Sequence, residues 1–210
     1  PPPSVCSVSK TFIPASAFAP PVVERRRLIR RGFHALSSLF VIYWWLPEYI
    51  EPLELTRQQV AVLGLSVLAA FEAYRIHRGW VFFGLRDYEK KRVAGYFWGA
   101  SGYVLALLFF DQRFAMITIL GTTLGDPVLG EFRETRFKRF APAAGFAVWC
   151  AVALVCIVLV PLSTPLALVP LGAALAVAAE SAKQPYIDDN FLMNIVPLVA
   201  LTAVSAGVGL

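Results

Sequence analysis

Residues 188–210 read DDNFLMNIVPLVALTAVSAGVGL, two carboxylates and an amide followed by a predominantly apolar run. A helix of about 20 apolar residues crosses the roughly 30 Å hydrocarbon core of a bilayer. Two further apolar runs end in a carboxylate, FAMITILGTTLGD at Asp126 and LALVPLGAALAVAAE at Glu180. Because charge at membrane depth is costly, such residues commonly mark sites for ions or charged substrates.

The composition extends this interpretation to the whole chain. Of its 210 residues, 58% are hydrophobic and 16% are charged, whereas soluble domains carry about 25% charged residues. We therefore predict an all-α fold, a multi-pass transmembrane helical bundle without a soluble domain beside it. The three cysteines suggest neither a disulfide framework nor a metal site. Residues 1–22, rich in proline and serine, are predicted to form a flexible tail, and 23–210 a single membrane-embedded domain.

Hydropathy predicts about seven spans, and the basic residues predict their orientation. Of the 19 lysines and arginines, all except Arg57 and Arg113 fall in the N-terminal tail or in loops on its side. Cytoplasmic loops are enriched in these residues, which places the N-terminus in the cytoplasm and the C-terminus outside. Because the net charge of +5 is divided among membrane loops, we expect no nucleic-acid partner. The expected spans are 33–50, 58–76, 94–110, 113–130, 142–161, 164–182 and 191–210.

In this topology the polar residues within the spans lie at the cytoplasmic ends, and the outer halves are apolar. A transporter needs polar groups near the midplane and a path to both sides. The sequence instead favours a site that works at the cytoplasmic leaflet.

The first span opens with a basic face. Arg27, Arg31 and His34 follow one another at i, i+4 and i+7, which places them on one side of a helix. Such a stripe can bind phosphate, with His34 just below the membrane surface. The alternative is that these arginines extend to the surface and only hold the topology.

Gly125-Asp126-Pro127 predicts a break in the fourth span. Pro127 disfavours helical backbone at Asp126 and suits the first position of a new helix. A helix N-terminus facing a wet cavity attracts phosphate, and the Asp126 carboxylate could hold a Mg²⁺ that bridges phosphates. The alternatives are a capped helix start without a ligand, or close helix packing at Gly121 and Gly125.

Asp188-Asp189-Asn190 precedes the last span. One of these residues can cap the helix, and the second carboxylate is then available as a metal ligand or a general base. Glu180 lies shortly before them in the sequence and could join the same metal site. Lys91 and Arg92 could neutralise phosphate, or they belong to a solvated loop. Glu72 and Arg75, at i and i+3, are expected to form a structural ion pair.

Together these residues resemble the polyprenol kinase family, which includes dolichol kinase, phytol kinase and prokaryotic relatives. The resemblance covers roughly 24–205 and rests on five features in the family's order. They are Arg30-Arg31-Gly32-Phe33-His34, Glu72-Ala73-Tyr74-Arg75, Lys90-Lys91-Arg92 before Gly95-Tyr96, Gly125-Asp126, and Asp188-Asp189-Asn190 ahead of the last span.

The resemblance implies phosphorylation of a long-chain isoprenoid alcohol at the cytoplasmic face, with CTP as donor and Mg²⁺. Asp126, Asp188 and Asp189 would hold metal and phosphates, with Asp188 or Asp189 as base. It also implies an integral protein of a prokaryotic plasma membrane or an organellar or ER membrane, and leaves the oligomeric state open. With the reasoning above, the candidate residues are: catalytic, Asp126, Asp188 and Asp189; nucleotide or phosphate contacts, Arg31, His34, Lys91, Gly125, Arg133 and Asn190; metal ligands, Asp126, Asp188, Asp189 and Glu180.

The segment after Gly-Asp departs from the family pattern. A glycine-rich basic loop usually follows, whereas this chain has GEFRETRFKRFAPAAGF, in which only Gly130, Arg133 and Lys138 match in part. Two alternatives therefore stay open, a CDP-lipid synthase (a cytidylyltransferase) and a catalytically inactive, lipid-binding member of the family.

Overall fold

The computed structural model describes residues 21–82, 85, 87–160, 164–182, 184 and 186–208. This part of the chain contains seven α-helices, several 3₁₀ turns and one short β-hairpin. The helices are α1 (Pro21–Ser37), α2 (Arg57–Arg78), α3 (Gly95–Phe109), α4 (Gln112–Glu134), α5 (Ala141–Leu159), α6 (Leu168–Ser181) and α7 (Asp189–Val208). The shorter elements are η2 (Ser38–Trp45), β1 (Tyr49–Ile50), η3 (Glu51–Leu53), β2 (Leu55–Thr56), η4 (Asp87–Lys91) and η5 (Lys138–Phe140).

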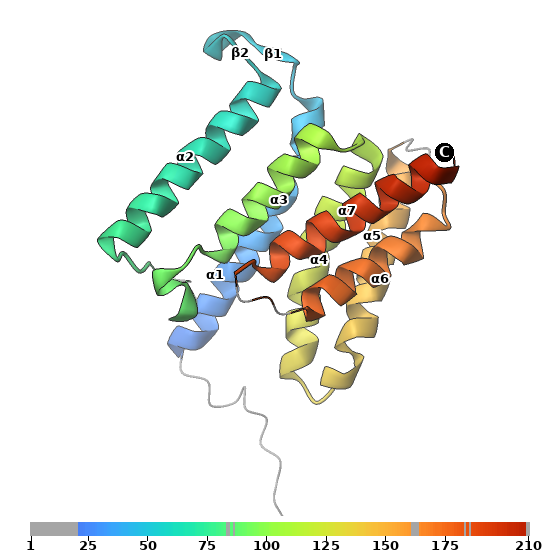
Figure 1. Ribbon diagram of the computed structural model, residues 1–210. Helices are drawn as coiled ribbons and strands as arrows, with labels where there is room; N and C mark the ends of the chain where they lie inside the picture. Colours follow the sequence, from blue (N-terminus) through green and yellow to red (C-terminus); the bar gives the residue numbers. More distant parts are fainter. Residues whose placement is uncertain are drawn as a thin grey trace, which may run out of the picture.

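The helices form an up-and-down bundle with α4 near its centre (Figure 1). α4 packs against α5, α7, α3 and the continuous segment of α1 and η2. α2 lies at the edge of the bundle beside α3, and the antiparallel β1–β2 hairpin joins it to η2 (Figure 1). The predicted all-helical fold is confirmed apart from this hairpin, whose strands have two residues each.

Three helices among the described residues are long and apolar enough to cross a membrane, Arg57–Arg78, Lys138–Leu159 and Asp189–Gly207. α3 and α6 are also apolar but have only 15 and 14 residues. At 1.5 Å per residue they reach about 22 Å, less than the roughly 30 Å of a hydrocarbon core. The coarse prediction of a helical membrane protein is thus supported, while seven spans remain an expectation.

The ends of α2 follow local rules. The Thr56 hydroxyl accepts from the Gln59 amide at 3.2 Å, and the Gln59 side chain accepts from the Thr56 amide at 2.8 Å. This reciprocal capping box satisfies two backbone donors at the helix start. Gly79 ends the helix with φ at +67°, a conformation that glycine adopts without steric cost.

The first span differs from its predicted range of 33–50. Helical structure runs from Pro21 through Trp45 as α1 and η2, so the basic segment 24–31 belongs to the same helical rod. The first two helical residues, Pro21 and Val22, fall inside the range predicted as tail. Residues 1–20 lie outside the described part of the chain.

The predicted break at Gly125 is wrong. α4 continues through Pro127 to Glu134, so Asp126 lies inside a helix and does not cap one. Proline removes one N–H from the helical ladder, here the donor to the Thr123 carbonyl, but packing can hold the helix together. Close packing with α5 supplies that support, since a methyl on Gly121 would lie 2.5 Å from Trp149 Nε1.

Candidate functional site

One end of the bundle contains a polar cavity of about 210 Å³. Four helices supply its walls: the middle of α1, the C-terminal part of α4, the end of α6 and the start of α7. These ends lie on the same side of the bundle (Figure 1). The lining residues are Arg30, Arg31, His34, Asp126, Pro127, Gly130, Arg133, Glu134, Glu180 and Asp189.

Two side-chain contacts join α1 to α4 beside this cavity. His34 Nε2 lies 3.2 Å from Asp126 Oδ2, and both side chains are largely buried. Arg31 pairs with Glu131, one turn beyond Asp126 on α4. Arg31 and His34, predicted from their spacing to share a basic face, therefore each contact a carboxylate of α4.

A third pair joins α4 to α6. Both terminal nitrogens of the Arg133 guanidinium donate to the Glu180 carboxylate. The Glu180 side chain is 2% exposed and that of Arg133 41%. A bidentate arginine–carboxylate pair is a strong, directional interaction. It neutralises a carboxylate that would otherwise be buried as a lone charge.

The adjacent carboxylates at the start of α7 differ in surroundings. Asp189 lines the cavity. Asp188 accepts from the Asn190 side chain at 2.6 Å and from the Asn190 amide at 3.0 Å. Asp188 Oδ2 also lies 3.1 Å from the position that a methyl on Gly95 would occupy, so Asp188 faces the start of α3.

The structure brings six of the predicted site residues to the cavity: Arg31, His34, Asp126, Arg133, Glu180 and Asp189. Four others do not line it. Lys91 is exposed in η4, Gly125 faces α5, Asp188 faces α3, and Asn190 is buried beside Asp188.

The sequence interpretation missed Arg30, Pro127, Gly130 and Glu134 as lining residues. The predicted helix break at Gly125 concealed the helical spacing that links three lining residues to Asp126. In a continuous α4, Gly130, Arg133 and Glu134 follow Asp126 at i+4, i+7 and i+8, which is one helix face.

The predicted carboxylates do not form a ready metal site. Within the part of the chain that the structure describes, no group of three or more His, Cys, Asp or Glu side chains is placed to hold an ion. Glu180 pairs with Arg133, Asp126 with His34, and Asp188 hydrogen-bonds to Asn190. The residues present therefore do not fit a resident Mg²⁺.

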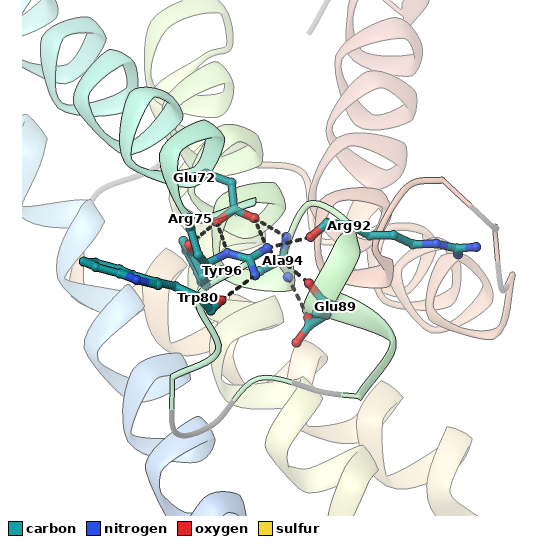
Figure 2. A network of polar contacts seen from close by, with 8 residues as sticks. Glu72, Arg75, Trp80, Glu89, Arg92, Ala94 and Tyr96 are labelled. Carbon is teal, nitrogen blue, oxygen red and sulfur yellow. Dashed lines mark hydrogen bonds and ion pairs between the residues drawn. The ribbon is translucent and has the colours of Figure 1, made fainter. Parts of the chain in front are cut away.

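A second polar cluster lies between α2 and α3 (Figure 2). We call it the Arg75 network; it consists of Glu72, Arg75, Glu89, Tyr96 and the backbone at Trp80, Arg92, Ala94 and Gly95. The Arg75 side chain is fully buried and that of Glu72 is 4% exposed. The predicted Glu72–Arg75 pair is confirmed, with 2.7 Å between Arg75 Nε and Glu72 Oε2.

No protein-family model, curated protein or solved structure matches the chain. The fold and the cavity define a class: an all-helical protein with membrane-length helices and a charge-lined cavity at one end of the bundle.

Proposed function

We propose that the protein is a CTP-dependent kinase that phosphorylates a long-chain isoprenoid alcohol at the cytoplasmic face of a membrane. One observation carries the proposal. Candidate residues chosen from sequence, between Arg31 and Asp189, line the same cavity although they come from four different helices. The resemblance to polyprenol kinases supplies the reaction, and the helices that suit a membrane agree with a lipid substrate.

The size of the cavity limits what it can hold. Pockets that enclose a drug-sized ligand have volumes of about 300–1,000 Å³, whereas this one is about 210 Å³. We infer that it takes the reacting ends of two substrates, the phosphate chain of the nucleotide and the hydroxyl of the alcohol. The nucleoside and the isoprenoid chain then lie outside it, the latter against the apolar helices.

Phosphoryl transfer depends mainly on positioning and on stabilising charge. Arg30, Arg31 and Arg133 supply cationic groups for the phosphates. Asp189 is the proposed base, since it lines the cavity and Asp188 does not. The alcohol oxygen bonds to the terminal phosphorus as its proton moves to Asp189. The bond from that phosphorus to the bridging oxygen breaks, and CDP leaves.

We propose that the nucleotide enters as its Mg²⁺ complex, so that the ion is part of the substrate. This agrees with the absence of a clustered metal-ligand set among the described residues. The orientation with seven spans, a cytoplasmic N-terminus and an outer C-terminus belongs to the same proposal, because it places the cavity on the side where nucleotide is available.

The test is a lipid-product assay with the full chain in nanodiscs, using CTP or ATP with Mg²⁺ and a panel of isoprenoid alcohols. We expect a phosphorylated lipid and CDP, and loss of both in Asp189→Asn and Asp126→Asn. Glu48→Gln is the matched control, because Glu48 is exposed and lies outside the cavity. Absence of phosphorylated lipid with every nucleotide would refute the kinase.

The same assay separates the alternatives. Release of pyrophosphate with formation of a CDP-lipid identifies a cytidylyltransferase. Lipid binding without turnover identifies an inactive family member. Both alternatives must be tested, because α4 continues as a helix to Glu134 where the family has its glycine-rich basic loop.

A further inference from the structure

The Arg75 network connects three segments through a buried guanidinium. Arg75 Nε donates to Glu72 Oε2 at 2.7 Å, and Arg75 Nη2 donates to Glu72 Oε1 at 2.8 Å. The Arg75 side chain has no exposed surface, so these partners must compensate its buried charge. Removing one partner of a buried pair leaves an uncompensated charge, which is strongly destabilising.

The Arg75 guanidinium also donates to backbone carbonyls beyond α2 (Figure 2). Arg75 Nη2 donates to the Arg92 carbonyl at 2.7 Å and to the Glu89 carbonyl at 3.1 Å, and Nη1 reaches the Trp80 carbonyl at 3.4 Å. One side chain of α2 thereby holds η4 and the approach to α3. A lysine presents three donors around a point charge and lacks this planar, forked geometry.

The carboxylates of the network hold the start of α3. Ala94, the residue before α3, has no local side-chain cap. The Ala94 amide donates to Glu72 Oε1 at 2.7 Å, and the Gly95 amide donates to Glu89 Oε1 at 2.8 Å. The Tyr96 hydroxyl donates to Glu72 Oε2. Donors that usually need a local cap are therefore satisfied from α2 and η4.

Gly95 is the contact between this network and α7. A methyl at Gly95 would lie 3.1 Å from Asp188 Oδ2 and 3.2 Å from Glu89 Oε1. Both distances are tighter than ordinary van der Waals contact, so a methyl at Gly95 would force these carboxylates to shift by a few tenths of an ångström. Asp188 in turn accepts from the Asn190 amide and precedes Asp189, which lines the cavity.

We propose that Arg75 is a positioning residue: through Glu72, Glu89 and Gly95 it sets the start of α3 and the place of Asp188, and thereby the place of the neighbouring Asp189 at the cavity. Arg75 does not line the cavity itself. An effect of this kind is large where chemistry depends on geometry, because a shift of about 1 Å can cost about 100-fold in rate. The effect of Arg75 on catalysis rests on the proposed function, whereas the structural coupling of Arg75 to Asp188 does not.

Hydrogen exchange on the full chain in nanodiscs tests the coupling without any activity. The amides of Asn190, Phe191 and Leu192 report on Asp188, since each donates to its side chain or its carbonyl. In Arg75→Gln we expect exchange about tenfold faster both at 94–96 and at 190–192, with the middle of α5 unchanged. Faster exchange at 94–96 alone would overturn the proposal.

Two further variants keep the test informative. Arg78→Gln is the matched control. Arg78 lies on the same helix but is exposed, and the structure shows it against the Tyr74 side chain. Hydrogen exchange in this variant should equal that of the parent chain.

Gly95→Ala disturbs the Asp188 contact and leaves Arg75 in place. If Arg75→Gln does not fold, Gly95→Ala must still speed hydrogen exchange at 190–192. Gly64→Ala is its control, because nothing lies within 4 Å of a methyl at Gly64. An unchanged rate there refutes the coupling.

The kinetic arm uses the lipid-kinase assay. We expect Arg75→Lys to lower kcat about tenfold or more per folded molecule, with KM for CTP changed less than about threefold. A purely structural role predicts a smaller active fraction with the same kcat for that fraction. If the parent chain is inactive, the proposed function fails, while the exchange result still decides whether Arg75 positions the start of α7.

Discussion

His34 on α1 and Asp126 on α4 meet across the cavity, with 3.2 Å between Nε2 and Oδ2. The contact joins residues that are far apart in the sequence, and both side chains keep less than a quarter of their surface exposed. It thus holds α1 against α4 as well as shaping the cavity.

A double-mutant cycle on His34 and Asp126 should show direct coupling. His34→Gln and Asp126→Asn each remove one partner of the contact, and the double variant removes both. We expect a coupling free energy of about 1 kcal/mol, the order found for partly hydrated pairs and for residues in contact. The measurement is unfolding in detergent by a chemical denaturant. Additive effects of the two single changes would show that the residues do not interact.

Loss of Arg133 should destabilise the fold more than loss of Arg136. Arg133→Gln leaves the Glu180 carboxylate buried without its cation. We expect a cost of roughly 3 kcal/mol, the low end for broken buried pairs, because water reaches the exposed side of Arg133. Arg136→Gln is the control, since Arg136 is exposed and stacks on Phe137. Adding Glu180→Gln to Arg133→Gln should restore part of the loss; no recovery would contradict this account.

The start of α2 offers a test of the fold that is independent of the site. Thr56→Ala removes the hydroxyl that accepts from the Gln59 amide. We expect a loss of about 1 kcal/mol, typical of a missing N-cap, and recovery in Thr56→Ser. Thermal unfolding in nanodiscs gives the comparison, and equal stability of the Ala and Ser variants would rule out the capping box as a contributor.

The turn between α4 and α5 should bind anionic lipid. Arg136 and Arg139 lie over the exposed rings of Phe137 and Phe140, at 4.8 and 4.6 Å, with Lys138 between them. Basic residues near an anionic leaflet contribute about 1 kcal/mol each, and aromatic rings favour the interface. Replacing Arg136, Lys138 and Arg139 by Gln should therefore lower the stabilisation that anionic nanodiscs give over neutral ones.

A matched control exists for this lipid effect at the opposite end of the bundle. Arg57 and Arg113 also lie over aromatic rings, at 5.1 and 4.7 Å. The Arg57→Gln/Arg113→Gln variant should keep more of the response to anionic lipid, because this end has two separate arginines rather than a cluster of three basic residues. An equal loss in both variants would show that the turn between α4 and α5 has no special affinity for anionic lipid.

Nucleotide should stabilise the native chain against heat. A ligand that binds only the folded state at 100 times its Kd adds about 2.7 kcal/mol. We expect CTP with Mg²⁺ to raise Tm more than ATP does, and Arg31→Gln to reduce the shift because Arg31 lines the cavity. Lys91→Gln separates two interpretations of η4: an unchanged shift assigns Lys91 to a solvated loop, and a reduced shift assigns it to phosphate binding.

The fold was predictable where hydrophobicity alone decides it. Apolar runs predicted α2, α3, α5, α6 and α7 to within several residues at each end, because each long apolar run folds as one uninterrupted helix. Local rules were misleading at Pro127, where packing of α4 on α5 maintains a helix that proline chemistry alone would end. Hydropathy alone began the first span at residue 33, whereas the helical spacing of Arg27, Arg31 and His34 correctly placed the basic segment on the same helix.

The candidate site was predictable residue by residue only where helix periodicity applies. Arg31 and His34 share a face by spacing, and both reach the cavity. Spacing cannot decide between Asp188 and Asp189, since neighbouring side chains at a helix start point in different directions. Two carboxylates have partners on other helices: Arg133 pairs with Glu180, and His34 contacts Asp126. Such contacts cannot be read from the spacing of residues along one helix.

The lining of the cavity is close to electrically balanced, with three arginines and a histidine facing four carboxylates. Such a site gives little general attraction to anions, because Arg133 and Arg31 already have partners that an incoming phosphate must displace. A small monoanion gains too little to drive this exchange, whereas a polyphosphate with several oxygens can compensate both arginines at once. If the protein binds nucleotide as proposed, we expect these internal ion pairs to favour a polyphosphate over inorganic phosphate without any excess of positive charge.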